Sequence, residues 1–94
     1  MYYLVSYDIA DNKQRGRAAK ILDDYGSRVQ KSVFEIAGLS DEMWKNCLAR
    51  LNKYVKLGDE DSIRIYLMCE TCRGKVQVIG KGPAPMESPD VIII

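Results

Sequence analysis

Residues 2–9 form an almost uninterrupted apolar run, which predicts a buried β-strand. Successive side chains of a strand point to opposite faces, so the run divides into two sets. One face would carry Tyr3, Val5, Tyr7 and Ile9, and the other Tyr2, Leu4, Ser6 and Asp8. Because both sets are largely apolar, we expect a central strand covered on both sides, with Asp8 near its carboxyl end.

The next periodic segment predicts a helix. Asp11 and Gln14 have the three-residue spacing of a capping box. Apolar residues then recur at helical spacing over 18–25, and Gly26 is well placed as the C-terminal cap. Residues 28–36 predict a second strand with a polar start.

A second helix is expected after the break at 38–40. Ser40 provides a suitable N-cap, and two acidic residues follow in the first turn. Apolar residues recur at helical spacing as far as Leu57, and Gly58 stops the helix.

Two further strands are expected, at 61–68 and 75–79, with a turn region at 69–74 between them. This order of elements predicts an α+β fold. A bend of residues 28–36 into a hairpin with the next segment of the chain gives the ferredoxin-like β-α-β-β-α-β architecture, with an extra C-terminal strand.

The chain end predicts an extended arm, because prolines follow Gly80. The β-branched run at 91–94 would promote aggregation if left open, so we infer a short strand that adds to a sheet edge of this chain or of a partner. We divide the chain into a ferredoxin-like domain at 1–82 and a C-terminal arm with a short strand at 83–94. We expect the arm to pack on a sheet edge of the partner subunit.

A chain of 94 residues is one domain with a small core, which favours a partner that covers an apolar face. The sequence has no run of about 20 apolar residues that would span a membrane, and no basic, signal-like start. Its three cysteines, an odd number, argue against a disulfide framework. We therefore expect a cytoplasmic protein with no membrane association.

Basic residues are concentrated in one segment, although the net charge is only +1. Residues 12–31 contain two acidic side chains and six basic ones: Lys13, Arg15, Arg17, Lys20, Arg28 and Lys31. Such a local excess suits a face that binds phosphates. The alternative is an ordinary solvated helix surface.

Asp8 is the candidate for chemistry. The sequence contains no histidine, so a hydrolase built from it would need carboxylates and a metal ion. Mg²⁺ prefers oxygen ligands and is often held by one or two carboxylates, so a two-fold axis that adds a second Asp8 would complete the ligand set. Ser6, on the same strand face, would support it. The alternatives are a carboxylate that caps the strand–helix turn, or two repelling carboxylates at an interface.

Three other features have more than one interpretation. Ser32 and Phe34 would lie near the active cleft, or Phe34 would belong to the core or to a dimer interface. The tyrosines of the first strand would stack on bases or pack within the sheet. Cys69 and Cys72 have the spacing of half a zinc site or of a redox pair, with inert thiols in a turn as the alternative.

Three landmarks occur in order along the chain: 7–9 (Tyr-Asp-Ile) at a strand end, 25–30 (Tyr-Gly-Ser-Arg-Val-Gln) leading into 32–35 (Ser-Val-Phe-Glu), and 79–82 (Ile-Gly-Lys-Gly) before the arm. With them, the chain resembles the second CRISPR-associated (Cas) protein family over essentially its whole length. The resemblance implies a ferredoxin-like homodimer whose C-terminal strand commonly crosses to the other subunit. It also implies a CRISPR-associated integrase as partner, a role in inserting spacer DNA, and a metal-dependent nuclease activity on RNA or DNA.

The chain departs from the family pattern in its first helix. Family members often carry adjacent arginines there, whereas Gly16 separates Arg15 from Arg17 in this sequence. At about 100° per residue, two positions two apart on a helix point in different directions. We therefore expect that Arg15 and Arg17 do not line one narrow groove.

The resemblance, together with these residues, implies a CRISPR adaptation subunit with Mg²⁺-dependent endonuclease activity. Asp8 would be its catalytic and metal-binding residue, and the contacts to DNA, or also RNA, would come from Arg15, Arg17, Lys20, Arg28 and Lys31. Two alternatives are a non-catalytic adaptor that bridges DNA and the integrase, and an RNA-cleaving toxin of the virulence-associated D type.

Overall fold

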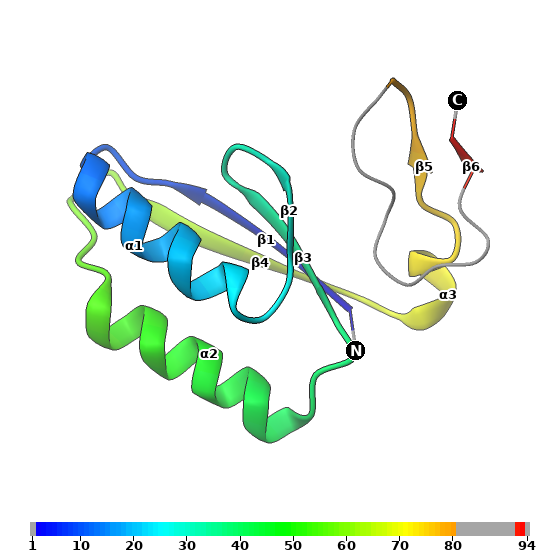
Figure 1. The fold of residues 1–94 in the computed structure, drawn as a ribbon, viewed down its shortest axis with the longest axis horizontal. Helices are drawn as coiled ribbons and strands as arrows, with labels where there is room; N and C mark the ends of the chain where they lie inside the picture. Colours follow the sequence, from blue (N-terminus) through cyan, green and yellow to red (C-terminus); the bar gives the residue numbers. More distant parts are fainter. Residues whose placement is uncertain (1, 81–91, 94) are drawn as a thin grey trace.

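Four antiparallel strands form the central sheet of the computed structural model, which describes residues 2–80 and 92–93 (Figure 1). The strands are β1 (Tyr2–Asp8), β2 (Ser27–Gln30), β3 (Val33–Ala37) and β4 (Ser62–Met68). Their order across the sheet is β2-β3-β1-β4. β1 is therefore central, as predicted, and it pairs with β3 on one side and β4 on the other.

Two helices cover one face of this sheet (Figure 1). Helix α1 (Asn12–Asp23) connects β1 to β2, and helix α2 (Asp41–Tyr54) connects β3 to β4. This connectivity, with the observed strand order, is the ferredoxin-like β-α-β-β-α-β fold, so the predicted fold class is confirmed. A short helix α3 (Glu70–Arg73) and the strand β5 (Gln77–Val78) follow β4.

The core lies between the sheet and the two helices. The predicted inward set of the first strand is buried: Tyr3, Val5, Tyr7 and Ile9. Val5, Leu22 and Phe34 have no exposed surface, and the ring of Tyr3 stacks on that of Trp44 with centroids 3.9 Å apart. Burial of each such side chain contributes roughly 1.5–3 kcal/mol, which makes this layer the main source of stability.

Helices α1 and α2 leave the opposite face of the sheet uncovered. We call it the open face and define it by Leu4, Ser6, Val33, Glu35 and Tyr66, which line a groove of about 560 Å³ between the sheet and the β5 segment. Leu4 and Ser6 are half-buried and Tyr66 is 46% exposed. The expectation that both faces of β1 are covered is therefore met only in part in a single chain, since Tyr2 on this side is buried but Asp8 is exposed.

The single strand predicted for residues 28–36 is wrong, because Lys31 and Ser32 form a turn that divides it into the β2–β3 hairpin. The Lys31 carbonyl stabilises this turn: it accepts hydrogen bonds from the Arg28 guanidinium and, at 3.2 Å, from the Tyr7 hydroxyl. The register between β2 and β3 shifts between Arg28 and Gln30, as in a β-bulge.

The helix ends also differ from the prediction. Asp11 caps α1, since its carboxylate accepts from the Gln14 backbone N–H at 2.9 Å. The Gln14 side chain, however, accepts from the Lys56 backbone N–H at 2.8 Å, so it ties α1 to the loop after α2. Helix α2 ends at Tyr54 rather than at Leu57.

The segment after β4 is more helical than predicted. The expected turn region at 69–74 contains α3, and the strand predicted for 75–79 covers only β5. The strand β6 (Ile92–Ile93) pairs in parallel with β5 of the same chain. Most of the arm at 83–94 lies outside the described residues, so the division at residue 82 and the packing of the arm on a partner stay predictions.

Candidate functional site

Asp8 is the last residue of β1, where its side chain is exposed and its backbone is in register with Ser62 of β4. The next loop is fixed by Asp61, whose carboxylate accepts from the Ala10 N–H at 3.1 Å and from the Gly58 N–H at 2.7 Å. Asp61 therefore joins the β1–α1 loop to the α2–β4 loop, and this holds the carboxyl end of β1 in place.

Asp8 lines a pocket of about 540 Å³ formed by the end of β1, the first turns of α1 and the β2–β3 hairpin. We call it the Asp8 pocket. It brings together five of the residues singled out from the sequence: Asp8, Arg15, Arg28, Lys31 and Ser32. Three cationic side chains thus face one carboxylate, which makes the pocket positive overall and suited to the phosphates of a polynucleotide.

The Arg15 side chain folds back from α1 toward the loop after β1. Its guanidinium donates to the carbonyls of Ile9 at 3.0 Å and Ala10 at 3.2 Å, and also to the side chain of Asn12. Arg15 therefore has two effects: it closes the loop next to Asp8, and it places a positive charge in the pocket.

The hairpin supplies the other two cations. Arg28 donates through Nε to the Lys31 carbonyl at 3.0 Å, and its guanidinium lies 5.7 Å from the centre of the Phe34 ring. The Tyr7 N–H donates to the Ser32 carbonyl at 3.0 Å, which fixes the turn against β1. The Lys31 side chain is exposed at the tip of this turn, where its charge is accessible to a ligand.

Arg17 and Lys20 lie in a different place, in a groove of about 400 Å³ between α1 and α2. This arrangement agrees with the prediction that Arg15 and Arg17 do not line one groove. We call it the basic groove and define it by Arg17, Lys20, Arg50, Lys53 and Lys56. Its last three members were not predicted, because they lie outside the basic segment 12–31. The signal was present as basic residues at the end of the second predicted helix.

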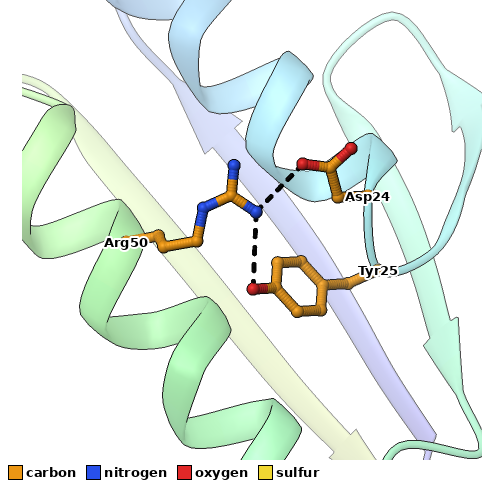
Figure 2. Close-up of polar contacts among 3 residues, drawn as sticks. All are labelled: Asp24, Tyr25 and Arg50. Atoms are coloured by element: carbon orange, nitrogen blue, oxygen red, sulfur yellow. Dashed lines mark hydrogen bonds and ion pairs between the residues drawn. The ribbon is translucent and has the colours of Figure 1, made fainter.

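Arg50 has its own partners, which Figure 2 shows. Its guanidinium donates to the Asp24 carboxylate at 2.9 Å and to the Tyr25 hydroxyl at 3.4 Å. Both hydrogen bonds raise the pKa of Arg50 above its ordinary value, and the one to Tyr25 has the larger effect. The contacts tie α2 to the end of α1, so the charge of Arg50 is largely matched within the protein.

The remaining predicted site residues lie away from the Asp8 pocket. Ser6 lies on the open face, and Phe34 has no exposed surface, which favours the core interpretation of Phe34. The tyrosines of β1 are buried, so they pack within the fold rather than offering rings to bases. Tyr2 is next to Glu35. The pKa of the Tyr2 phenol is raised mainly by its burial and also by the neighbouring Glu35 carboxylate.

A single chain offers little to a metal ion. Among the residues that the structure describes, no three His, Cys, Asp or Glu side chains gather in a way that could hold one. Asp8 supplies one exposed carboxylate, which is the oxygen chemistry that Mg²⁺ prefers. The donor set therefore fits Mg²⁺ only when a second carboxylate, or phosphate oxygens, add to it. Within the described ranges, no helix has the length and apolar character needed to cross a membrane.

Comparison with known proteins gives a consistent result. The family model for CRISPR associated protein Cas2 matches residues 1–76. A relative from Chloroflexus aurantiacus, named CRISPR-associated endoribonuclease Cas2 1, is 42% identical over 94 residues, which are 100% of both chains.

Solved structures agree with the sequence comparisons. The crystal structure of Streptococcus pyogenes Cas2 is 34% identical, with a TM-score of 0.70 over 85% of this chain and 100% of that chain. A chain of a partial Cas6-RT-Cas1–Cas2 complex is 26% identical, with a TM-score of 0.69 over 80% of each chain. This chain therefore belongs to the CRISPR-associated Cas2 family.

Proposed function

We propose that the protein is a metal-dependent endonuclease that acts as a homodimer in CRISPR adaptation, with Asp8 as its catalytic and metal-binding residue. The observation that carries the proposal is the Asp8 pocket, in which one exposed carboxylate lies among Arg15, Arg28 and Lys31. The name of the Chloroflexus relative, an endoribonuclease, supports the same activity. The cytoplasmic location expected from the sequence belongs to this proposal.

The three cations would bind the sugar–phosphate backbone. Their charges lower the free energy of a bound phosphate without reading its base, so binding would be salt-dependent and largely independent of sequence. The guanidinium of Arg28 is planar and suited to bidentate contact with phosphate oxygens. Because the hairpin backbone is hydrogen-bonded to β1, the hairpin residues Arg28 and Lys31 lie next to Asp8 before the ligand arrives.

Asp8 would provide the negative oxygen atoms of the reaction centre. A bound divalent ion would lower the pKa of a water molecule and polarise the scissile phosphate. The protein contributes the carboxylate that orients this chemistry and the cations that hold the nucleic acid. Since the sequence contains no histidine, no imidazole can act as the general base.

The homodimer would supply the second carboxylate. By strand alternation, Asp8 is on the same side of β1 as Leu4 and Ser6, so packing of two open faces would bring two Asp8 residues to a shared interface. An exposed aromatic side chain on this face supports such packing: Tyr66 of the edge strand β4 is 46% exposed.

A second function, that of a DNA-bridging adaptor for an integrase, is supported by the basic groove. The groove lies on the helix side of the sheet, opposite the open face, so dimerisation through the open face would leave it accessible to DNA. The similarity to a chain of a complex that contains Cas1 and Cas2 favours a Cas1-type integrase as the partner. The two functions are compatible in one dimer.

A nuclease assay with matched variants tests the first function. Wild type, Asp8→Ala and Asp23→Ala would be incubated with single-stranded RNA and duplex DNA, with magnesium or with a chelator. Asp23 is an exposed carboxylate on α1 outside the pocket, so it controls for the loss of one negative charge. We expect magnesium-dependent cleavage by wild type and Asp23→Ala and none by Asp8→Ala. Cleavage by Asp8→Ala at the wild-type rate would refute the catalytic role.

An integration assay with the integrase partner tests the adaptor function. We expect Asp8→Ala to support integration and Arg17→Glu combined with Lys20→Glu to abolish it. Lys45→Glu, an exposed position on α2 outside the basic groove, is the control and should behave as wild type. Normal integration by the double variant would show that the groove does not hold DNA.

A further inference from the structure

Cys69 and Cys72 lie directly after β4, at the start of α3, and both side chains are exposed. Their sulfur atoms are 3.3 Å apart. A disulfide bond is about 2.05 Å long, so the sulfur atoms need to approach by only about 1.2 Å, which side-chain rotation can provide. The two thiols are thus already placed for closure.

The two thiols differ in their surroundings. Cys69 is the N-cap of α3, and its sulfur accepts a hydrogen bond from the Cys72 backbone N–H at 3.4 Å. This backbone hydrogen bond, followed by the contact with the Cys72 thiol, lowers the pKa of Cys69. The neighbouring Cys69 sulfur in turn raises the pKa of Cys72. Because the thiolate is the reactive form of cysteine, Cys69 has the character of the attacking thiol and Cys72 that of the resolving one.

Cys47 provides a reference within the same chain. It is completely buried in the core, and burial raises the pKa of its thiol to about 11. A buried thiol of this kind reacts slowly with oxidants, because it is rarely ionised and is not accessible. Reactivity at 69 and 72 can therefore be measured against an inert cysteine under identical conditions.

We propose that Cys69 and Cys72 form a reversible redox pair that hydrogen peroxide converts into an intramolecular disulfide. The Cys69 thiolate attacks one peroxide oxygen, the O–O bond breaks, and the sulfur is oxidised to a sulfenic acid while hydroxide leaves and takes up a proton as water. The Cys72 thiol then attacks the Cys69 sulfur, the S–S bond forms, and the sulfenic hydroxyl leaves with the Cys72 proton as a second water. Two thiols are oxidised and one peroxide is reduced.

The pair acts away from the Asp8 pocket and does not rest on the proposed nuclease function. In the β1–β4 register, Tyr2 opposes Met68 next to the cysteines, whereas Asp8 opposes Ser62 at the other end of β1. The cysteines occupy the link between the sheet and β5, which borders the groove along the open face. The disulfide would restrict this link and leave the Asp8 pocket unchanged.

Treatment of the full, reduced chain with one equivalent of hydrogen peroxide tests the proposal, with the products identified by peptide mass mapping. We expect a Cys69–Cys72 disulfide that dithiothreitol reverses, and a Cys47 that stays a free thiol. In Cys72→Ser the reaction should stop at a Cys69 sulfenic acid that dimedone traps. Cys69→Ser should lose the fast reaction altogether.

A variant-free measurement removes any dependence on folding of the variants. Iodoacetamide should alkylate Cys69 of the wild-type chain first, Cys72 second and Cys47 last. The proposal is overturned if Cys69 reacts no faster than Cys72, if Cys69→Ser is oxidised as fast as wild type, or if peroxide produces only disulfides between chains.

Discussion

Lys31→Ala isolates the electrostatic part of the Asp8 pocket. In the described residues, the hydrogen bonds at Lys31 are made by its backbone carbonyl, which accepts from Tyr7 and Arg28. Loss of the side chain should therefore remove one positive charge and leave the hairpin in place. Arg28 is a poorer choice, because its guanidinium holds the turn.

The size of the effect can be worked out from counterion release. Each phosphate contact contributes about 0.9 to the slope of log K against log salt for duplex DNA, so three cations give a slope of about −2.7. Lys31→Ala should reduce the slope by about 0.9 for one pocket, or by about 1.8 where a dimer lays both pockets on one duplex. At about 0.1 M salt, loss of one contact weakens binding about eightfold, or by about 1.2 kcal/mol.

Fluorescence anisotropy of a labelled duplex, measured over a range of salt concentrations, gives the slope of log K against log salt for wild type and for Lys31→Ala. Lys45→Ala is the matched control, since it removes the same charge from an exposed position on α2 outside the pocket. The weakening by Lys31→Ala should be similar for unrelated DNA sequences and should vanish at high salt. Equal slopes for the two variants, or a loss of affinity that salt does not change, would refute the phosphate role of the pocket.

Three further predictions concern stability. Phe34→Ala should lower the free energy of unfolding, measured by urea denaturation, by about 3–5 kcal/mol out of a total of about 5–14 kcal/mol, because the ring is completely buried. A loss below about 1 kcal/mol would contradict the placement of Phe34 in the core. Asp61→Ala removes acceptors from two backbone N–H groups and should cost about 1–2 kcal/mol in thermal melts, whereas Asp59→Ala, in the same loop, should be nearly neutral. The pKa of Cys47 is raised from 9.0 to about 11, so the folded state holds this proton more tightly than the unfolded state. The stabilisation from this protonated thiol is complete below pH 9 and is lost between about pH 9 and pH 11. The difference in free energy of unfolding between wild type and Cys47→Ala should therefore decrease over that range and stay constant below it.

Much of the fold could be predicted because local patterns agree with tertiary packing. The alternation of residues 2–9 gave the correct inward face of β1, and the Asp11 and Ser40 caps are both observed. The sequence suggested a hairpin between residues 28–36 and the next segment, but the turn inside 28–36 was missed because it depends on a long-range contact, the hydrogen bond from Tyr7 to the Lys31 carbonyl. Local sequence around Lys31 and Ser32 carries no glycine or proline that would mark a turn.

Gly26 shows a similar limit. Its position suggested the C-terminal cap of α1, but that cap is Asp24. The structure requires glycine at position 26 for another reason, because a Cβ there would lie 2.4 Å from the Glu35 carbonyl oxygen of β3. Such an approach between two distant segments is not visible in a sequence.

The candidate site was predictable in its parts rather than in its arrangement. The charge count identified Arg15, Arg28 and Lys31 but did not separate them from Arg17 and Lys20, which face a different groove. Helix periodicity separated Arg15 from Arg17, since both lie on one helix. The meeting of the hairpin with the end of β1 depends on the strand order, which periodicity does not determine.

The location of a divalent ion tests the central claim most directly. Manganese in place of magnesium broadens the NMR signals of nearby amides, so a titration of isotope-labelled protein in the presence of a short oligonucleotide reports where the ion binds. We predict broadening at Asp8, Ile9 and Ser32 that is absent in Asp8→Ala. Broadening confined to the acidic loop at 59–61, or unchanged by Asp8→Ala, would contradict the assignment of Asp8 as the metal-binding residue.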